Sequence, residues 1–192
     1  MSLEADLLRR VRAGPTNASL LYAISSMGLP QGALVAGAVV QAVWNGLQRR
    51  PVDAGVKDYD IFYYDPDLSE AAEKAIQAEL RALYPYLTLD IRNQARVHLW
   101  YEARFGVPCA PITSTIDGIG RFPVTCTCVG ISGAGEVLAP YGLEALYAGR
   151  LAANPACPDP TAFARKAASY RERWPWLGEH SQIQNSKISH NS

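Results

Sequence analysis

The sequence predicts a single α+β domain in which helices flank a mixed β-sheet. Two observations lead to this fold class. Helical and strand segments alternate irregularly along the 192 residues, and two late strands are connected closely enough to form an antiparallel hairpin. The sequence contains neither a repeated βαβ unit nor an interior linker long enough to divide it. With 48% hydrophobic and 19% charged residues, the chain can bury a core of its own.

The helices are predicted from apolar side chains spaced three and four residues apart, and from the residues that start and stop them. The pair Gly14–Pro15 ends the first helix, and Thr16 or Asn17 is the candidate cap of the second. Asp67, with Glu70 three residues later, resembles a capping box at the start of the fourth. In chain order, the expected helices cover residues 3–13, 16–27, 37–48, 69–84, 94–104, 114–120, 143–151 and 160–173.

The strands are predicted from runs rich in β-branched and aromatic residues, bounded by glycine, proline and polar residues. The segment KDYDIFYYD is typical of such a run, and SGAG at 132–135 joins the two strands of the hairpin. In chain order, the expected strands cover residues 34–36, 57–65, 87–91, 124–131 and 136–139. Residues 178–192 have no apolar period and are expected to form a disordered tail, which leaves 1–177 as the domain.

The charge balance argues against an anionic macromolecule as a partner. Lys and Arg together number 18, as do Asp and Glu, whereas a protein that binds duplex DNA or an anionic membrane usually carries a basic excess. The longest apolar stretch, 33–44, is shorter than the roughly 20 residues needed to span a bilayer. The charged N-terminus lacks the apolar centre of a secretion signal, and the four cysteines are too irregular for a disulfide framework. We therefore expect a cytoplasmic protein.

Two carboxylates lie two residues apart on the predicted strand 57–65. Side chains alternate along a strand, so Asp58 and Asp60 point to the same side, with Cα atoms about 7 Å apart. They repel each other unless a cation lies between them, and Mg²⁺ prefers carboxylate and phosphate oxygens. Two such ions can hold the attacking and leaving oxygens of a phosphoryl displacement. The alternative is that the pair only marks a strand end, with both side chains solvated or capping a turn.

A strand-to-helix turn and a third carboxylate add to this pattern. Gly37 and Ala38 open a helix directly after a buried strand, and a helix N-terminus with small residues can bind an anion through its N–H groups. The alternative is an ordinary tight turn, since the sequence lacks a full G-x-G-x-x-G and a P-loop Lys. Asp90 lies on the strand predicted next. If that strand pairs with 57–65, three carboxylates converge.

The series AGA at 36–38, KDYD at 57–60 and Asp90 on a later strand resembles the nucleotidyltransferase superfamily with the DNA-polymerase-beta-type fold. The sequence is more closely similar to an uncharacterised bacterial nucleotidyltransferase-like family. The segments that carry this likeness are AGAVVQAVWN (36–45), VKDYDIFYYDPDLS (56–69), RNQARVHLWYEARFG (92–106) and LAPYGLEALYAG (138–149). The resemblance spans residues 16–150, the expected core of the domain, and implies a polymerase-beta-type nucleotidyltransferase fold.

The resemblance also implies a reaction and roles for individual residues. Asp58 and Asp60 would hold Mg²⁺ or Mn²⁺ ions that bridge the triphosphate of an NTP. Asp90 would complete a second metal site and help to activate an acceptor hydroxyl. The backbone of Gly37 and Ala38 would let amides approach the phosphates. With zero net charge, a small molecule or a protein side chain is the expected acceptor, rather than a long nucleic acid or a membrane.

A polar cluster directly after Asp90 supplies further candidates for nucleotide contact. Arg92 and Arg96 carry guanidinium groups that match phosphate oxygens in pairs, and Asn93 lies between them. Trp100 and Tyr101 could stack a base. The alternative is that this cluster caps and orients a short helix, with Arg96 paired internally to Asp90 or Asp60.

The chain departs from the superfamily in ways that favour a second hypothesis. Many relatives have Gly-Ser or Gly-Gly where this chain has Gly37–Ala38, and some have an Arg where it has Val40 and Gln41. The alternative function is therefore a non-catalytic nucleotide-binding or protein-interaction module on the same fold. Cys126 and Cys128 form a single C-x-C on an expected strand, which fits buried packing better than a zinc site.

Overall fold

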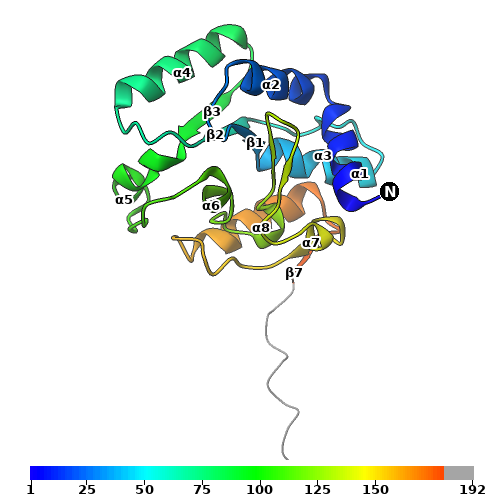
Figure 1. Ribbon diagram of the computed structural model, residues 1–192. Coiled ribbons are helices and arrows are strands. Elements are labelled where there is room, and N and C mark those ends of the chain that lie inside the picture. The colour runs from blue at the N-terminus through cyan, green and yellow to red at the C-terminus, as the bar shows by residue number, and fades with distance from the viewer. Residues whose placement is uncertain (180–192) are drawn as a thin grey trace, which may run out of the picture.

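A five-stranded mixed sheet with the strand order β3-β2-β1-β4-β5 lies at the centre of the fold (Figure 1). The structure, a computed structural model, describes residues 1–179. β1 pairs antiparallel with β2 and β4, β2 pairs parallel with β3, and β4 pairs antiparallel with β5. The strands are β1 (Ala33–Val35), β2 (Tyr59–Tyr63), β3 (Leu89–Asn93), β4 (Gly130–Ser132) and β5 (Val137–Leu138), with a separate parallel pair of β6 (Arg150–Leu151) and β7 (Gly178–Glu179).

Helices cover both faces of this sheet. α2 and α4 lie against one face, and α5 and α6 lie beside the other (Figure 1). The α-helices are α1 (Leu3–Arg12), α2 (Pro15–Ser26), α3 (Gly37–Leu47), α4 (Glu70–Leu83), α5 (Tyr101–Phe105), α6 (Thr115–Ile119), α7 (Glu144–Tyr147) and α8 (Ala162–Arg173). Two 3-10 helices are η1 (Gln94–Leu99) and η2 (Thr125–Thr127). The predicted α+β class with a mixed sheet flanked by helices is confirmed.

The larger core lies on the side of the sheet that α1 to α4 cover. Leu34, Ile61, Ile91 and Ile131 come from four adjacent strands and are fully buried there, together with Trp44 of α3. Burial of such side chains is the main driving force for folding. A smaller cluster on the opposite face contains Ala33, Val35, Ile119 and Cys128. The site described below lies on that opposite face.

Several local predictions are corrected by the structure. Gly14 rather than Thr16 or Asn17 precedes the second helix, with Pro15 at its first position. Ser69, not Asp67, caps α4, because its hydroxyl accepts a hydrogen bond from the Ala72 amide. The expected helix 94–104 divides into η1 and α5.

The late strands are also shorter than expected. The first hairpin strand was predicted over 124–131, but residues 125–127 form η2 and β4 begins only at Gly130. The helix expected at 143–151 is a single turn, α7. The tail expected at 178–192 lies outside the described residues, apart from Gly178 and Glu179 in β7. Within residues 1–179, each helix is too short or too polar to cross a membrane.

Candidate functional site

Strand pairing brings the acidic residues together. β2 and β3 run parallel with Asp60 directly opposite Asp90, and adjacent strands lie about 4.8 Å apart. Asp58 precedes β2 by one residue, so it lies just outside the strand rather than within it as predicted. Asp60 and Asp90 are partly buried, whereas Asp58 is exposed. The three carboxylates therefore share one region at the start of two parallel strands.

The charges of neighbouring side chains act on Asp60. Burial, and then the negative charges of Asp58 and Asp90, raise the pKa of Asp60 from 3.8 to about 7. The positive charges of Lys166 and Arg92 act in the opposite direction, without restoring the ordinary value. Near neutral pH, a carboxyl group with this pKa is only partly ionised. A cation bound beside it would favour the fully charged form.

The side chain of Asp90 already has a cationic partner. Arg92 Nε donates a hydrogen bond to Asp90 Oδ1 at 2.6 Å, and the same guanidinium lies 5.1 Å from the centre of the Trp100 ring. Within residues 1–179, no three Asp, Glu, His or Cys side chains stand close enough together to hold a metal ion. The donor chemistry nevertheless fits a divalent cation. Carboxylates are the ligands that Mg²⁺ prefers, and Asp60 lies among like charges that a cation would neutralise.

The turn between β1 and α3 lies beside the acidic residues. Val35 of β1 pairs with Asp60, so the chain that continues past Val35 runs toward Asp58. Ala36 has φ 53°, a left-handed conformation that costs energy for a residue with a Cβ. Such strain is found most often at functional sites.

The N-terminus of α3 is open to an anion. No side chain caps it, and within residues 1–179 the N–H groups of Gly37 and Ala38 have no acceptor. A Cβ at Gly37 would lie 3.0 Å from Gln41 Nε2, so glycine leaves room for the Gln41 side chain at this turn. Free N–H groups and the helix dipole together favour a phosphate at this point.

A cavity of about 180 Å³ extends from the acidic residues to an aromatic cluster. Asp60, Asp90, Arg92, Trp100 and Tyr101 are among the residues that line it. Trp100 Nε1 is buried and has no hydrogen-bond partner within residues 1–179. The cavity therefore combines carboxylates with a flat aromatic surface, which are the groups that a nucleotide requires.

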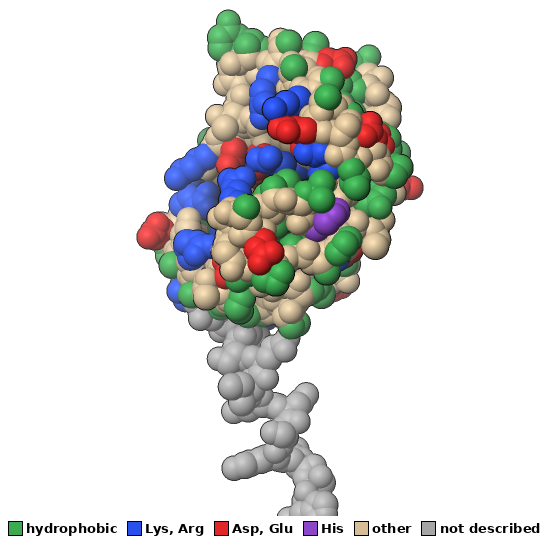
Figure 2. Space-filling view, turned by 90° about the vertical axis from the view of Figure 1, so that its left-hand side faces the viewer, with side chains coloured by type: hydrophobic (Ala, Val, Ile, Leu, Met, Phe, Trp, Pro, Cys, Tyr) green, Lys and Arg blue, Asp and Glu red, His purple; other side chains and the backbone are tan. Residues whose placement is uncertain are grey.

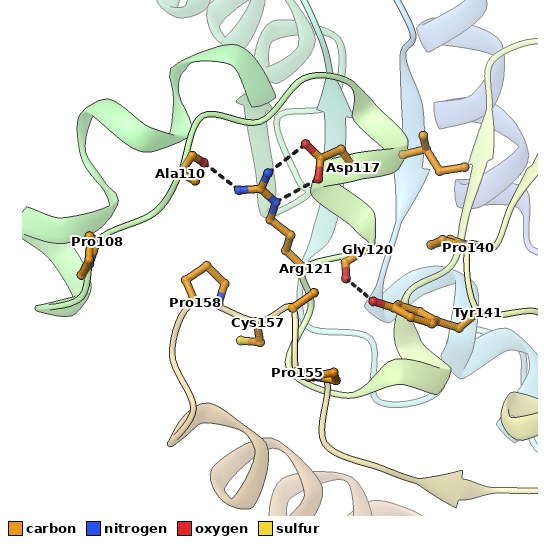
Figure 3. A pocket seen from close by; sticks show the side chains of 12 residues that line it. Pro108, Ala110, Asp117, Gly120, Arg121, Pro140, Tyr141, Pro155, Cys157 and Pro158 are labelled. Atoms are coloured by element: carbon orange, nitrogen blue, oxygen red, sulfur yellow. Dashed lines mark hydrogen bonds and ion pairs between the residues drawn. The ribbon is translucent and has the colours of Figure 1, made fainter.

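A second and larger cavity, of about 750 Å³, adjoins the first through Arg121 and Pro158, which line both (Figure 3). Arg121 forms two contacts of 2.9 Å with the carboxylate of Asp117 and donates hydrogen bonds to the carbonyl groups of Ala110 and Pro111. These bonds fix the loop around residues 108–111 against α6. Arg121 thus holds the wall between the two cavities in place.

Arg96 and Asn93, both predicted to contact the nucleotide, lie elsewhere. Arg96 Nε donates to Glu73 Oε2 at 3.0 Å, in a buried ion pair with α4 rather than with Asp90 or Asp60. Asn93 Oδ1 accepts hydrogen bonds from the amides of Ala95 and Asp65, and its Nδ2 donates to the Asp65 carbonyl. Neither side chain lines the cavity beside Asp60. The structure therefore gives them structural roles in the region between β3 and η1.

The predicted C-x-C pair is buried away from any such chemistry. Cys126 lies in η2 and Cys128 directly follows it, so the two thiols are not on one face of a strand. Burial raises the pKa of both thiols to about 12, which keeps them protonated.

Several residues near the site were not found by sequence reasoning. Arg104 and Phe105 line the smaller cavity, with the Arg104 guanidinium 5.8 Å from the Trp100 ring centre. Lys166 of α8 reaches the acidic residues electrostatically from a distant part of the chain. In the view of Figure 2, Lys and Arg side chains gather across the middle of the molecule, with Asp and Glu side chains among them. The net charge of zero conceals this local asymmetry.

Known proteins resemble the chain in both sequence and structure. A family described as nucleotidyltransferase matches residues 22–178. A solved protein whose NMR structure is described as revealing a CCA-adding enzyme head domain superposes with a TM-score of 0.75 and 25% sequence identity. The alignment covers 93% of this chain and 96% of that one. A search of curated proteins found no match.

Proposed function

The chain belongs to this nucleotidyltransferase family, and from that premise we propose that it moves a nucleoside monophosphate from an NTP to a hydroxyl group of a small molecule or a protein. The observation that supports this proposal is the pairing of Asp60 with Asp90 across β2 and β3, with Asp58 one residue before β2 and the uncapped N-terminus of α3 following the strand that pairs with Asp60. In a metal-bound triphosphate, the carboxylates would bind the metal ion and the free amides would donate hydrogen bonds to the phosphate oxygens.

The proposed binding mode assigns the triphosphate to the turn before α3. The amides of Gly37 and Ala38 donate to phosphate oxygens, since they have no other acceptor within residues 1–179. Asp58 and Asp60 hold the divalent cation, Mg²⁺ or Mn²⁺. When bound, this ion neutralises charge on the triphosphate and favours departure of pyrophosphate. The base lies in the smaller cavity against Trp100 and Tyr101.

Asp90 and Arg92 change partners in this scheme. In the structure they pair with each other at 2.6 Å. Phosphate oxygens compete for the Arg92 guanidinium, and this competition frees Asp90 to accept a hydrogen bond from the acceptor hydroxyl. The larger cavity, which adjoins the first at Arg121, provides room for that acceptor.

Thermal unfolding with each of the four NTPs, in the presence of Mg²⁺ or Mn²⁺, tests nucleotide binding. A ligand at a hundred times its Kd stabilises the folded state by about 2.7 kcal/mol, which corresponds to a rise of about 5–10 °C in Tm for a domain of this size. The rise should require metal and should be lost in Asp58→Asn and Asp60→Asn. Asp53→Asn is the matched control, because Asp53 is exposed in the loop before β2.

The nucleotide found in this way is then supplied with an α-phosphate label to wild type and Asp60→Asn, together with a cell extract. Label transfer by wild type alone is the expected result. Binding without transfer would favour the alternative of a non-catalytic nucleotide-binding module. Absence of any metal-dependent rise in Tm would overturn the proposed function.

A further inference from the structure

Helix α3 carries three buried side chains that contain polar atoms, those of Gln41, Trp44 and Asn45. Trp44 Nε1 donates a hydrogen bond to the Leu146 carbonyl at 3.1 Å. Asn45 Oδ1 accepts one from Trp174 Nε1 at 3.0 Å, and Asn45 Nδ2 donates to two carbonyl groups of the loop that follows α3, at 3.2 and 2.9 Å. The fold therefore provides partners for the buried polar atoms of Trp44 and Asn45.

Gln41 is the exception among these three residues. Its side chain is only 4% exposed, and its Oε1 has no hydrogen-bond partner in the part of the chain that the structure describes. Its Nε2 forms no hydrogen bond with those residues either. Burying an amide without a partner costs free energy, and buried polar groups in folded proteins are nearly always paired. The unpaired carboxamide therefore indicates a partner that a ligand supplies.

The carboxamide of Gln41 lies at the N-terminus of α3. Gln41 comes four residues after Gly37, so the two share one face of the helix, and helical side chains lean toward the N-terminus. A Cβ at Gly37 would lie 3.0 Å from Gln41 Nε2, which places this nitrogen at the first turn. The N–H groups of Gly37 and Ala38 also lack acceptors among residues 1–179. Three donors without acceptors thus lie at the same end of α3.

We propose that Gln41 binds the triphosphate of the NTP in its complex with the divalent cation, and so adds a side chain to the amides of Gly37 and Ala38. Nε2 donates to a phosphate oxygen. Oε1 accepts from a water molecule of the cation, because Mg²⁺ usually keeps several waters when it binds phosphate. Such a complex offers a partner to each end of the carboxamide, whereas phosphate oxygens alone offer only acceptors. This inference rests on the proposed function and adds a binding residue to it.

Binding of inorganic triphosphate with and without Mg²⁺, measured by calorimetry, tests this role independently of turnover. Gln41→Met keeps the length of the side chain and removes both polar atoms. We expect it to weaken the Kd for triphosphate with Mg²⁺ about tenfold. Gln41→Glu replaces the donor by a negative charge and should weaken binding at least as much. Gln48→Met is the matched control, because Gln48 is exposed at the end of α3, and this variant should bind as wild type does.

The stability of the ligand-free protein separates a ligand-binding group from a structural one. Gln41→Met removes an unpaired amide from the interior, so its Tm without ligand should lie about 3 °C above that of wild type. A lower Tm would mean that Gln41 forms hydrogen bonds that the fold requires, which would overturn the inference. Gln48→Met should leave the Tm unchanged.

The binding results also distinguish this inference from the proposed function. If Gln41→Met binds triphosphate as tightly as wild type while Asp58→Asn loses metal-dependent NTP binding, Gln41 is not a ligand and the proposed function stands. Undiminished binding by Gln41→Glu would exclude donation to a phosphate oxygen. An equal loss in Gln48→Met would assign the effect to α3 as a whole, which also overturns the role of Gln41. If wild type binds neither NTP nor triphosphate, both proposals are wrong.

Discussion

Replacing Asp60 by asparagine tests the electrostatics of the site, because the change removes a charge and nearly preserves the side-chain shape. Burial, then Asp58 and Asp90, raise the pKa of Asp60 from 3.8 to about 7 in the folded protein. In the unfolded chain the carboxyl ionises near its ordinary value, so the folded state binds the extra proton between these two values. The free energy of unfolding of the wild type should therefore fall as the pH rises through this interval.

The size of this effect follows from the shift. One pKa unit corresponds to about 1.4 kcal/mol. A rise from 3.8 to about 7 therefore lowers the free energy of unfolding by at most about 4 kcal/mol. Asp60 is partly exposed, and solvent screening reduces the expected loss to about 2 kcal/mol. Asparagine has no proton to lose. At pH 8 and without metal, Asp60→Asn should therefore be more stable than wild type by this amount, or by at least about 4 °C in Tm.

Urea unfolding followed by tryptophan fluorescence, in buffers with a chelator between pH 5 and pH 8, measures this difference. The difference in free energy of unfolding between Asp60→Asn and wild type should widen steadily with pH, and Mg²⁺ at pH 8 should stabilise wild type but not Asp60→Asn. Asp53→Asn controls for the loss of one negative charge and should show no such widening. A variant that is less stable than wild type at pH 8, or a gap that does not change with pH, would refute the reasoning.

Three further substitutions test the structural roles assigned above. Arg96→Met should lower the free energy of unfolding by about 3 kcal/mol in urea titrations, because Glu73 is left buried without its partner, while the KM for NTP stays unchanged. Ala36→Gly should raise stability by about 1 kcal/mol, since glycine adopts φ 53° without strain but loses more entropy on folding. Arg121→Met should cost about 2 kcal/mol and speed proteolysis near residues 108–111, because the loop loses its hydrogen bonds to the guanidinium.

The sequence predicted the elements whose signals are local. The strand–turn–helix at 34–48 and the strand around Tyr59–Tyr63 were found because their apolar patterns and glycine turn lie within a few residues of each other. The strand 124–131 was predicted wrongly for a related reason. Alternation of Thr and Cys in VTCTC imitates a strand, but the segment turns through η2 to cover the smaller core cluster. Tertiary packing decides such short segments, and periodicity alone does not reveal it.

For the site, the sequence predicted residues but not their partners. Convergence of Asp58, Asp60 and Asp90 was predicted on the condition that the strand of Asp90 pairs with that of Asp60, and the structure pairs these two residues directly. The partner of Arg96 could not be predicted, because Glu73 lies 23 residues earlier on a helix whose rotation is set by packing. Lys166 carries no local signal, since it acts on the charge of Asp60 from α8, far from β2 along the chain.

The charges of the site make sense only when metal and nucleotide are considered together. Asp60 is held among carboxylates at a cost in stability, and the positive charges of Lys166 and Arg92 relieve it only in part. A metal ion alone would neutralise the carboxylates but would meet repulsion from both cations. A triphosphate alone would bind those cations but would be repelled by Asp58, Asp60 and Asp90. A metal-bound NTP satisfies both sets of charges at once, so the site is complementary to that complex rather than to either component.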